Sequence, residues 1–160
     1  MKETYQQMKS RHQSEFETLP IFYAFTTSQL DEALEARGLN RETLPAGTLS
    51  MLGSGALCLT SDKPFILSEG ERMMNEKLAA IEDYDFAFGA FLYEMNDHEY
   101  FINYQGDWDV LSVFGLDDDV SEFSDDKGAS DYMKDMGFGK ETRLAYYAAA
   151  REHYRLSEEW

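Results

Sequence analysis

The chain of 160 residues has the length of one ordinary domain, and its apolar content of 43% is enough to form a hydrophobic core without disulfides. A formal net charge of −17 argues against direct binding to nucleic acid or to anionic membranes, because like charges repel. No apolar stretch approaches the roughly 20 residues of a membrane span, and the single cysteine, Cys58, cannot form an internal disulfide. We therefore expect one compact cytoplasmic domain over residues 1–160.

The first third of the chain predicts two helices and a strand. Apolar side chains at helical spacing indicate an amphipathic helix over residues 3–17. The short apolar stretch IFYAF, residues 21–25, predicts a buried strand or extended segment. A second helix is predicted to be capped by Ser28 with Asp31 and to end at Gly38.

The next part of the chain predicts a strand and then a long helix. ALCLT, residues 56–60, is short, apolar and flanked by turn residues, as is typical of a strand. The helix that follows ends at about Glu82 and has two possible starts, one capped by Asp62 and one capped by Ser68. With either start, its buried stripe is predicted to contain Met74, Leu78 and Ile81.

The aromatic segment DFAFGAFLYEMNDHEYFINY is ambiguous, because its apolar residues fit both the helical and the strand period. We favour a helix to about Asp97 and then a strand through Tyr104. Asp107 is predicted to cap a short helix that ends at Gly115 and buries three apolar residues, Val110, Leu111 and Phe114.

The C-terminal segment predicts the last helix, over about residues 140–158, because it is rich in alanine. Leu144, Tyr147 and Tyr154 are expected to hold this helix against the core. Together these elements predict an α+β fold, a helix-rich single domain with a small β-sheet.

The negative charge is concentrated in the second half of the chain. Residues 1–80 carry 11 acids and 8 bases, whereas residues 81–160 carry 20 acids and 6 bases. Between Lys77 and Lys127 lie 49 residues without Lys or Arg, and 14 of them are Asp or Glu. We call this interval the cation-free segment. Its field attracts a basic partner.

The most acidic part of the cation-free segment is GLDDDVSEFSDD, residues 115–126, within a predicted acidic loop or surface segment at 115–130. A calcium loop that starts at Asp117 would need Gly where Glu122 stands and Glu where Gly128 stands, so this pattern does not fit. Two readings stay open, a solvated loop and a recognition surface. If the run were helical, its charges would lie about 3 Å apart, close to the spacing of phosphates along a DNA strand.

A second candidate site is DHE, residues 97–99, which places a histidine, a possible general base, between two carboxylates, with His98 and Glu99 as its candidate residues. Catalysis or metal binding there would need further partners. Neither His12 nor His153 supplies them by spacing, and no zinc-protease pattern is present. We therefore expect no metal and no cofactor, and His98 fixed by hydrogen bonds at the end of an element is the simpler interpretation.

Several stretches of the chain resemble a family of small uncharacterised proteins from prophages and mobile elements of Gram-positive bacteria. The similarity covers about residues 4–116 and rests on four stretches, TYQQMKSRHQSEF, LPIFYAFTTSQLDEAL, YEMNDHEY and GDWDVLSVFGL. Those relatives carry Asn where this chain has Asp97, and this difference weakens the case for a site there. The resemblance implies a phage or mobile-element context and no particular chemistry.

The leading hypothesis from the sequence is a non-enzymatic inhibitor of a host nucleic-acid-processing defence enzyme, of the anti-CRISPR or anti-restriction type, that occupies the basic groove of this enzyme as a DNA mimic. Trp108 or Phe123 would be its apolar anchor. The carboxylates that would meet the basic protein surface are Asp117, Asp118, Asp119, Glu122, Asp125 and Asp126. The alternative is a small phage accessory enzyme or ligand-binding protein with a pocket near His98 and Glu99. The oligomeric state is open.

Overall fold

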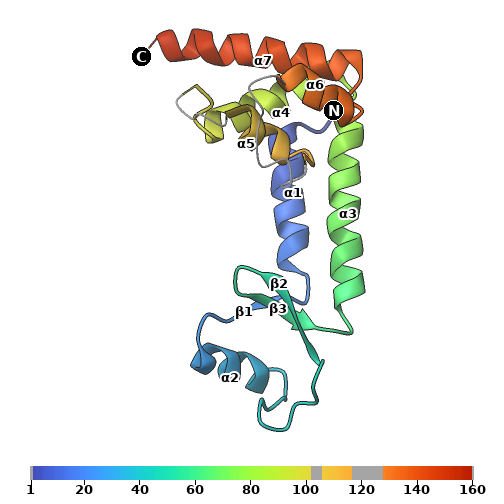
Figure 1. Ribbon diagram of the computed structural model, residues 1–160, viewed down its shortest axis with the longest axis vertical. Helices are drawn as coiled ribbons and strands as arrows, with labels where there is room; N and C mark the ends of the chain where they lie inside the picture. Colours follow the sequence, from blue (N-terminus) through green and yellow to red (C-terminus); the bar gives the residue numbers. More distant parts are fainter. Residues whose placement is uncertain (1, 102–105, 117–127, 160) are drawn as a thin grey trace. The chain divides into compact units, whose positions relative to one another are not determined.

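The structure, a computed structural model, describes residues 2–101, 106–116 and 128–159 (Figure 1). It divides into two compact units. Unit 1 comprises Met1–His12 and Met73–Trp160, and unit 2 comprises Gln13–Arg72. Seven helices and one three-stranded antiparallel sheet in the described residues confirm the predicted helix-rich α+β fold class. That the whole chain forms a single compact domain stays a prediction.

Unit 2 contains the sheet, whose strand order is β1-β3-β2. Strands β1 (Phe22–Tyr23) and β3 (Ala56–Leu59) confirm the two strands expected from the apolar stretches. Strand β2 (Leu49–Gly53) was not predicted, because it lacks a continuous apolar run. A tight turn joins β2 to β3, and a side chain at Gly55 in this turn would overlap the ring of Phe25.

Helix α2 (Thr27–Glu35) begins earlier than predicted. Thr26, and not Ser28, is the N-cap, and its hydroxyl accepts a hydrogen bond from the Gln29 N–H at 3.2 Å. The Gln29 side chain reaches back and accepts from the Phe25 N–H at 2.8 Å, so the two side chains satisfy two N–H groups at the start of the helix. Three consecutive residues, Thr26, Thr27 and Ser28, carry a hydroxyl that could cap the helix. The paired hydrogen bonds with Gln29 select Thr26 as the N-cap.

Two long helices contribute residues to both units. Helix α1 (Tyr5–Glu17) confirms the predicted N-terminal helix, and α3 (Lys63–Ala80) begins directly after Asp62, the earlier of the two starts considered. In unit 2, the buried side chains Leu19, Cys58 and Ile66 form a small core. No helix in the described part of the chain is long and apolar enough to cross a membrane.

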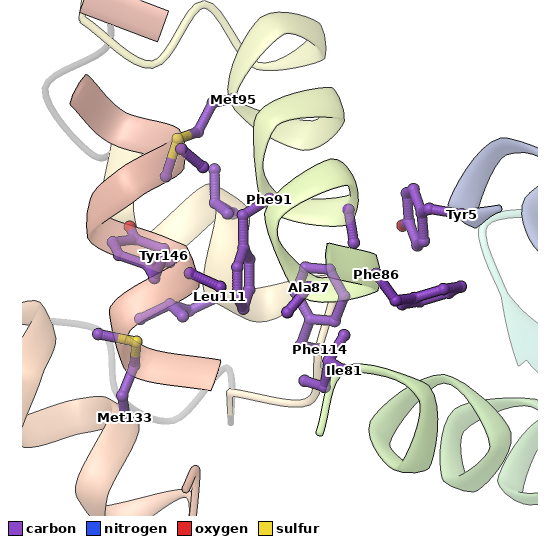
Figure 2. Close-up of a cluster of buried hydrophobic side chains, with 14 of the residues drawn as sticks. Tyr5, Ile81, Phe86, Ala87, Phe91, Met95, Leu111, Phe114, Met133 and Tyr146 are labelled. Atoms are coloured by element: carbon purple, nitrogen blue, oxygen red, sulfur yellow. The ribbon is translucent and has the colours of Figure 1, made fainter. Parts of the chain in front are cut away.

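Unit 1 is built around α4 (Tyr84–Asp97), which packs against α7 (Lys140–Glu158). Helices α5 (Gly106–Ser112) and α6 (Ala129–Asp135) complete it. Phe91 of α4 lies at the centre of the core, 5.1 Å from the Tyr146 ring and 4.9 Å from the Phe114 ring, both in edge-to-face geometry (Figure 2). These contacts bring α4, α7 and the end of α5 together.

Two predictions about the middle of unit 1 are wrong. The strand expected after α4 is absent from its described part, because residues 98–101 form a turn; residues 102–105 lie outside the described residues. Asp107 does not cap α5 but lies inside its first turn. The favoured helix to Asp97 is confirmed, as are the buried residues Val110, Leu111 and Phe114.

Helix α7 buries a different face from the one predicted. Leu144, Tyr147 and Tyr154 were expected to hold it against the core, but they are 47%, 37% and 51% exposed. The opposite face is buried instead and contains Thr142, Ala145, Tyr146 and Ala149. Aromatic residues occur on both faces of α7, so their spacing in the sequence does not show which face is buried. Alanine side chains let the backbone of α4 approach closely, and this selects their face.

The two neighbouring tyrosines of α7 provide a matched test of this orientation. Tyr146→Ala should lower the free energy of unfolding by about 3–5 kcal/mol, since it removes a fully buried aromatic ring. Tyr147→Ala should cost about 0.5 kcal/mol, as expected for a surface change. Urea denaturation followed by circular dichroism measures both. Equal losses would show that the helix is turned differently.

Candidate functional site

The structure describes part of the predicted partner-binding surface. Seven of the predicted residues lie outside the described residues: Asp117, Asp118, Asp119, Glu122, Phe123, Asp125 and Asp126. Trp108 is described and lies in α5, where it is half-buried against the core of unit 1. Its indole Nε1 is buried and has no hydrogen-bond partner among the described residues. A buried donor without a partner costs free energy, so this N–H is a notable feature of the surface.

The described acids of the cation-free segment differ in their surroundings. Asp83 pairs with Lys2 at 2.7 Å, and Asp107 and Glu94 accept bonds from tyrosines. The exposed acids Glu82, Asp85, Asp97 and Glu99 form no ion pair with a Lys or Arg of the described residues. Their charge is therefore not compensated within the described surface.

Lys77, which borders the cation-free segment, is turned inward. Its ammonium group donates a hydrogen bond of 2.8 Å to the Val113 carbonyl and lies 5.7 Å from the centre of the Phe114 ring. Burial lowers the pKa of Lys77. This cation is thus partly withdrawn from the surface, so it offsets less of the negative charge of the neighbouring acids.

The most unusual charged group in unit 1 is Glu94, whose side chain is only 1% exposed. Its Oε1 accepts a hydrogen bond from the Tyr5 hydroxyl and another, at 2.9 Å, from the Lys9 ammonium group. Lys9 also lies over the Tyr93 ring, 4.6 Å from its centre. A buried carboxylate needs such compensation, because removing a charge from water is costly. Burial, together with the bond to Glu94, raises the pKa of Tyr5.

Glu94 is brought next to the predicted residue His98. The His98 Nε2 lies 3.4 Å from Glu94 Oε2, one helical turn away. Asp97 completes a group of three side chains that could each offer one ligand atom to a metal ion, and these three atoms lie within 4.8 Å of one another. From the sequence, His98 was expected to act with Glu99, and Glu94 was not predicted as its partner. The available signal was the separation of four residues between Glu94 and His98, which places both on one face of a helix.

Glu99 is not part of this group and lies just after the end of α4. Its φ of +50° is left-handed, a conformation that normally belongs to glycine. The Tyr100 N–H donates to the Met95 carbonyl at 3.1 Å, and this bond closes the helix. The exposed side chain of Glu99 therefore occupies a position at which the backbone favours glycine.

A second carboxylate in unit 1, Asp107, accepts hydrogen bonds from two phenols. The Tyr100 hydroxyl donates at 2.5 Å, and the Tyr146 hydroxyl donates to the same oxygen. Burial is the main cause that raises the pKa of both tyrosines, and the Asp107 charge adds to it. A side chain at Gly106 would overlap the Tyr100 carbonyl, so a glycine is needed beside this cluster. The arrangement links α5, α7 and the turn after α4.

Comparison with known proteins identifies a family. A family of unknown function, DUF7659, matches residues 4–126. The chain belongs to this family. The match includes the acidic run, which the resemblance noted from the sequence had left outside, and it ends before α7, although α7 supplies part of the core. No curated protein and no solved structure matches the chain.

Three tyrosines with raised pKa values predict a loss of stability at alkaline pH. Tyr5, Tyr100 and Tyr146 have raised pKa values in the folded state, so their contribution is complete below about pH 10 and declines as the pH rises above it. Urea midpoints should therefore fall as the pH rises above about 10, and Tyr146→Phe should reduce this dependence. The exposed Tyr23 is the control, and Tyr23→Phe should leave the slope unchanged. An identical slope in the Tyr146→Phe variant would contradict the assignment.

The conformation of Glu99 predicts a stabilising substitution. Glu99→Gly should raise the free energy of unfolding by about 1 kcal/mol, because glycine adopts the left-handed conformation without steric cost. Thermal unfolding measures the effect. Gly70→Ala is the converse control, because it removes a glycine from the exposed middle of helix α3, where alanine is the better helix former. It should also raise the free energy of unfolding. A loss of stability in Glu99→Gly would mean that the glutamate side chain makes a contact that stabilises the fold by more than the left-handed backbone conformation destabilises it.

Proposed function

We propose that this chain is a cytoplasmic, non-enzymatic protein of phage or mobile-element origin that binds the basic groove of a nucleic-acid-processing host enzyme. One observation carries the proposal, the cation-free segment of 49 residues with 14 acids. A protein that mimics nucleic acid needs a continuous negative field without cations to interrupt it. The segment meets this requirement along the sequence.

The described surface supports the proposal in two ways. Four exposed acids of the cation-free segment form no ion pair with a described Lys or Arg, so they are available to Lys and Arg of a partner: Glu82, Asp85, Asp97 and Glu99. The bordering cation Lys77 is engaged by the Val113 carbonyl and does not offset them. Electrostatic complementarity of this kind accelerates association more than it increases affinity.

Affinity would come from an apolar anchor within the acidic surface. Trp108 is the described candidate, since tryptophan is enriched among the residues that dominate binding energy. Its half-buried ring packs on the core, and its indole N–H lacks a partner among the described residues. A carbonyl or carboxylate of the bound enzyme could accept this hydrogen bond after a small rearrangement. The acidic run follows Trp108 in the sequence and would add carboxylates to the interface.

A second candidate function is a ligand-binding or catalytic role centred on His98. The observation that favours it is the imidazole facing the buried carboxylate of Glu94 at 3.4 Å. His98 does not line the pocket of about 410 Å³ in unit 1, which lies between the end of α3 with the turn after it and residues 136–142 at the start of α7. This pocket therefore does not support a ligand site at His98, whereas the groove-binding function is supported by a charge pattern that extends over 49 residues.

Competition distinguishes the two functions. The full chain is immobilised and used to capture proteins from a host lysate at about 0.05 M salt, and the captured enzyme is then offered its own DNA or RNA substrate. Nucleic acid should displace the chain, and about 0.5 M salt should release it, because screening shortens from above 10 Å to a few Å. Capture that survives both treatments would contradict binding in the nucleic-acid groove.

Charge neutralisation tests which acids take part. Changing Asp117, Asp118 and Asp119 to Asn should slow association with the captured enzyme about tenfold or more at low salt and leave the melting temperature nearly unchanged. The matched control changes three exposed acids of unit 2 to Gln, Glu32, Glu35 and Glu42. It removes the same charge from outside the cation-free segment and should slow association much less. Equal effects would mean that net charge, and not this surface, directs binding.

A further inference from the structure

Three side chains at the C-terminal end of α4, one of them on its C-cap residue His98, have the composition and spacing of a metal-binding set. Glu94, Asp97 and His98 each offer one ligand atom, and these atoms lie within 4.8 Å of one another. We propose that they form a binding site for a first-row divalent cation, with Zn²⁺ as the best fit. The proposal does not depend on the function proposed above.

The distance between the two inner ligands fits zinc. Glu94 Oε2 and His98 Nε2 lie 3.4 Å apart. Two ligands at zinc bond lengths of about 2.0–2.1 Å and at a tetrahedral angle are separated by about 3.4 Å. Only Asp97 has to move, and its exposed side chain can do so by rotation. The backbone of α4 therefore already places two ligands at the required separation.

The surroundings of Glu94 orient it for this role. Tyr5 and Lys9 both donate to Oε1, which leaves Oε2 facing the imidazole. Ligating carboxylates in metal sites are normally held by such outer hydrogen bonds. Lys9 also compensates one of the two carboxylates while no metal is bound. Its ammonium group opposes a cation nearby, so we expect moderate affinity and not the very tight binding of a structural zinc site.

The donor types select the metal. One imidazole and two carboxylates suit zinc and its first-row neighbours, whereas calcium and magnesium prefer oxygen ligands alone. Three protein ligands leave a fourth position for water, the arrangement of zinc sites in which a water is activated. The site also lies at the C-terminal end of a helix, where the helix dipole favours a positive charge. The sequence-based expectation of no metal site considered Asp97, His98 and Glu99, a set without the buried carboxylate.

Titration of the full chain tests the proposal with two probes. Zn²⁺ is measured by calorimetry, and Co²⁺ is measured by its visible absorption, which is strong in tetrahedral sites. The wild type should bind one ion saturably, and His98→Ala and Asp97→Asn should each weaken binding at least tenfold. Both residues are partly or fully exposed, so these variants should fold, and circular dichroism verifies this. The Glu94→Gln variant is not used, because its side chain is buried.

Two control variants replace a glutamate and a histidine that lie outside the proposed metal-binding set. Glu99→Gln lies beside the site, and His153→Asn removes the histidine whose Nδ1 lies 2.7 Å from the Asn96 amide oxygen. Both should bind Zn²⁺ within about twofold of the wild type. The absence of saturable binding in the wild type overturns the proposal, as does unchanged binding after His98→Ala or after Asp97→Asn. Tighter binding of Ca²⁺ than of Zn²⁺ overturns the choice of metal and the role of the imidazole.

Discussion

The burial of α4 is the constraint on which unit 1 depends. Its buried residues are Phe86, Ala87, Ala90, Phe91, Glu94 and Met95, a surface wider than the single stripe of a helix at the edge of a core. One neighbouring helix cannot cover such a surface, so side chains from α1, α5 and α7 surround it, as Figure 2 shows for Tyr5, Leu111 and Tyr146. The small residues Ala87 and Ala90 allow close approach, and Phe91 fills the space between the surrounding elements. The fold of unit 1 is in this sense the means by which one apolar helix is removed from water.

The same burial creates a polar requirement that α1 satisfies. Glu94 lies within the covered surface, and an unpaired carboxylate there would be strongly destabilising. Tyr5 and Lys9, one turn apart on α1, both reach its Oε1. Because replacing such a group by an apolar residue is often neutral or stabilising, the buried pair is weak support for a purely structural role. A functional use of Glu94, with its second oxygen aimed at His98, accounts for its presence more directly.

Charge distribution connects the proposed binding to a basic groove with the proposed zinc site. The cation-free segment concentrates acids without a Lys or Arg of its own. Lys2 and Lys9 pair with two of these acids, whereas the exposed acids Glu82, Asp85, Asp97 and Glu99 form no ion pair with a described Lys or Arg. A field of that sign attracts any cation, whether it is the Lys or Arg of a protein groove or a small divalent ion. The distinction between them lies in geometry. A basic groove needs an extended array of charges, whereas a zinc ion needs three ligand atoms within one small volume, as at the end of α4.

The sequence alone determined the helix-rich α+β class, the positions of α1, α4 and α7, the strands β1 and β3, and the segregation of charge, because periodicity, composition and capping residues are local properties of the chain. It did not determine which face of α7 is buried, since aromatic residues stand on both faces and contact with α4 decides between them. Nor did it reveal Glu94 as the partner of His98, because a glutamate in a helix is ordinarily exposed. Only the tertiary structure brings Tyr5 to a carboxylate 89 residues away. Burial and side-chain pairing depend on contacts between segments that are distant in the sequence, and local sequence patterns do not show which distant segments come into contact.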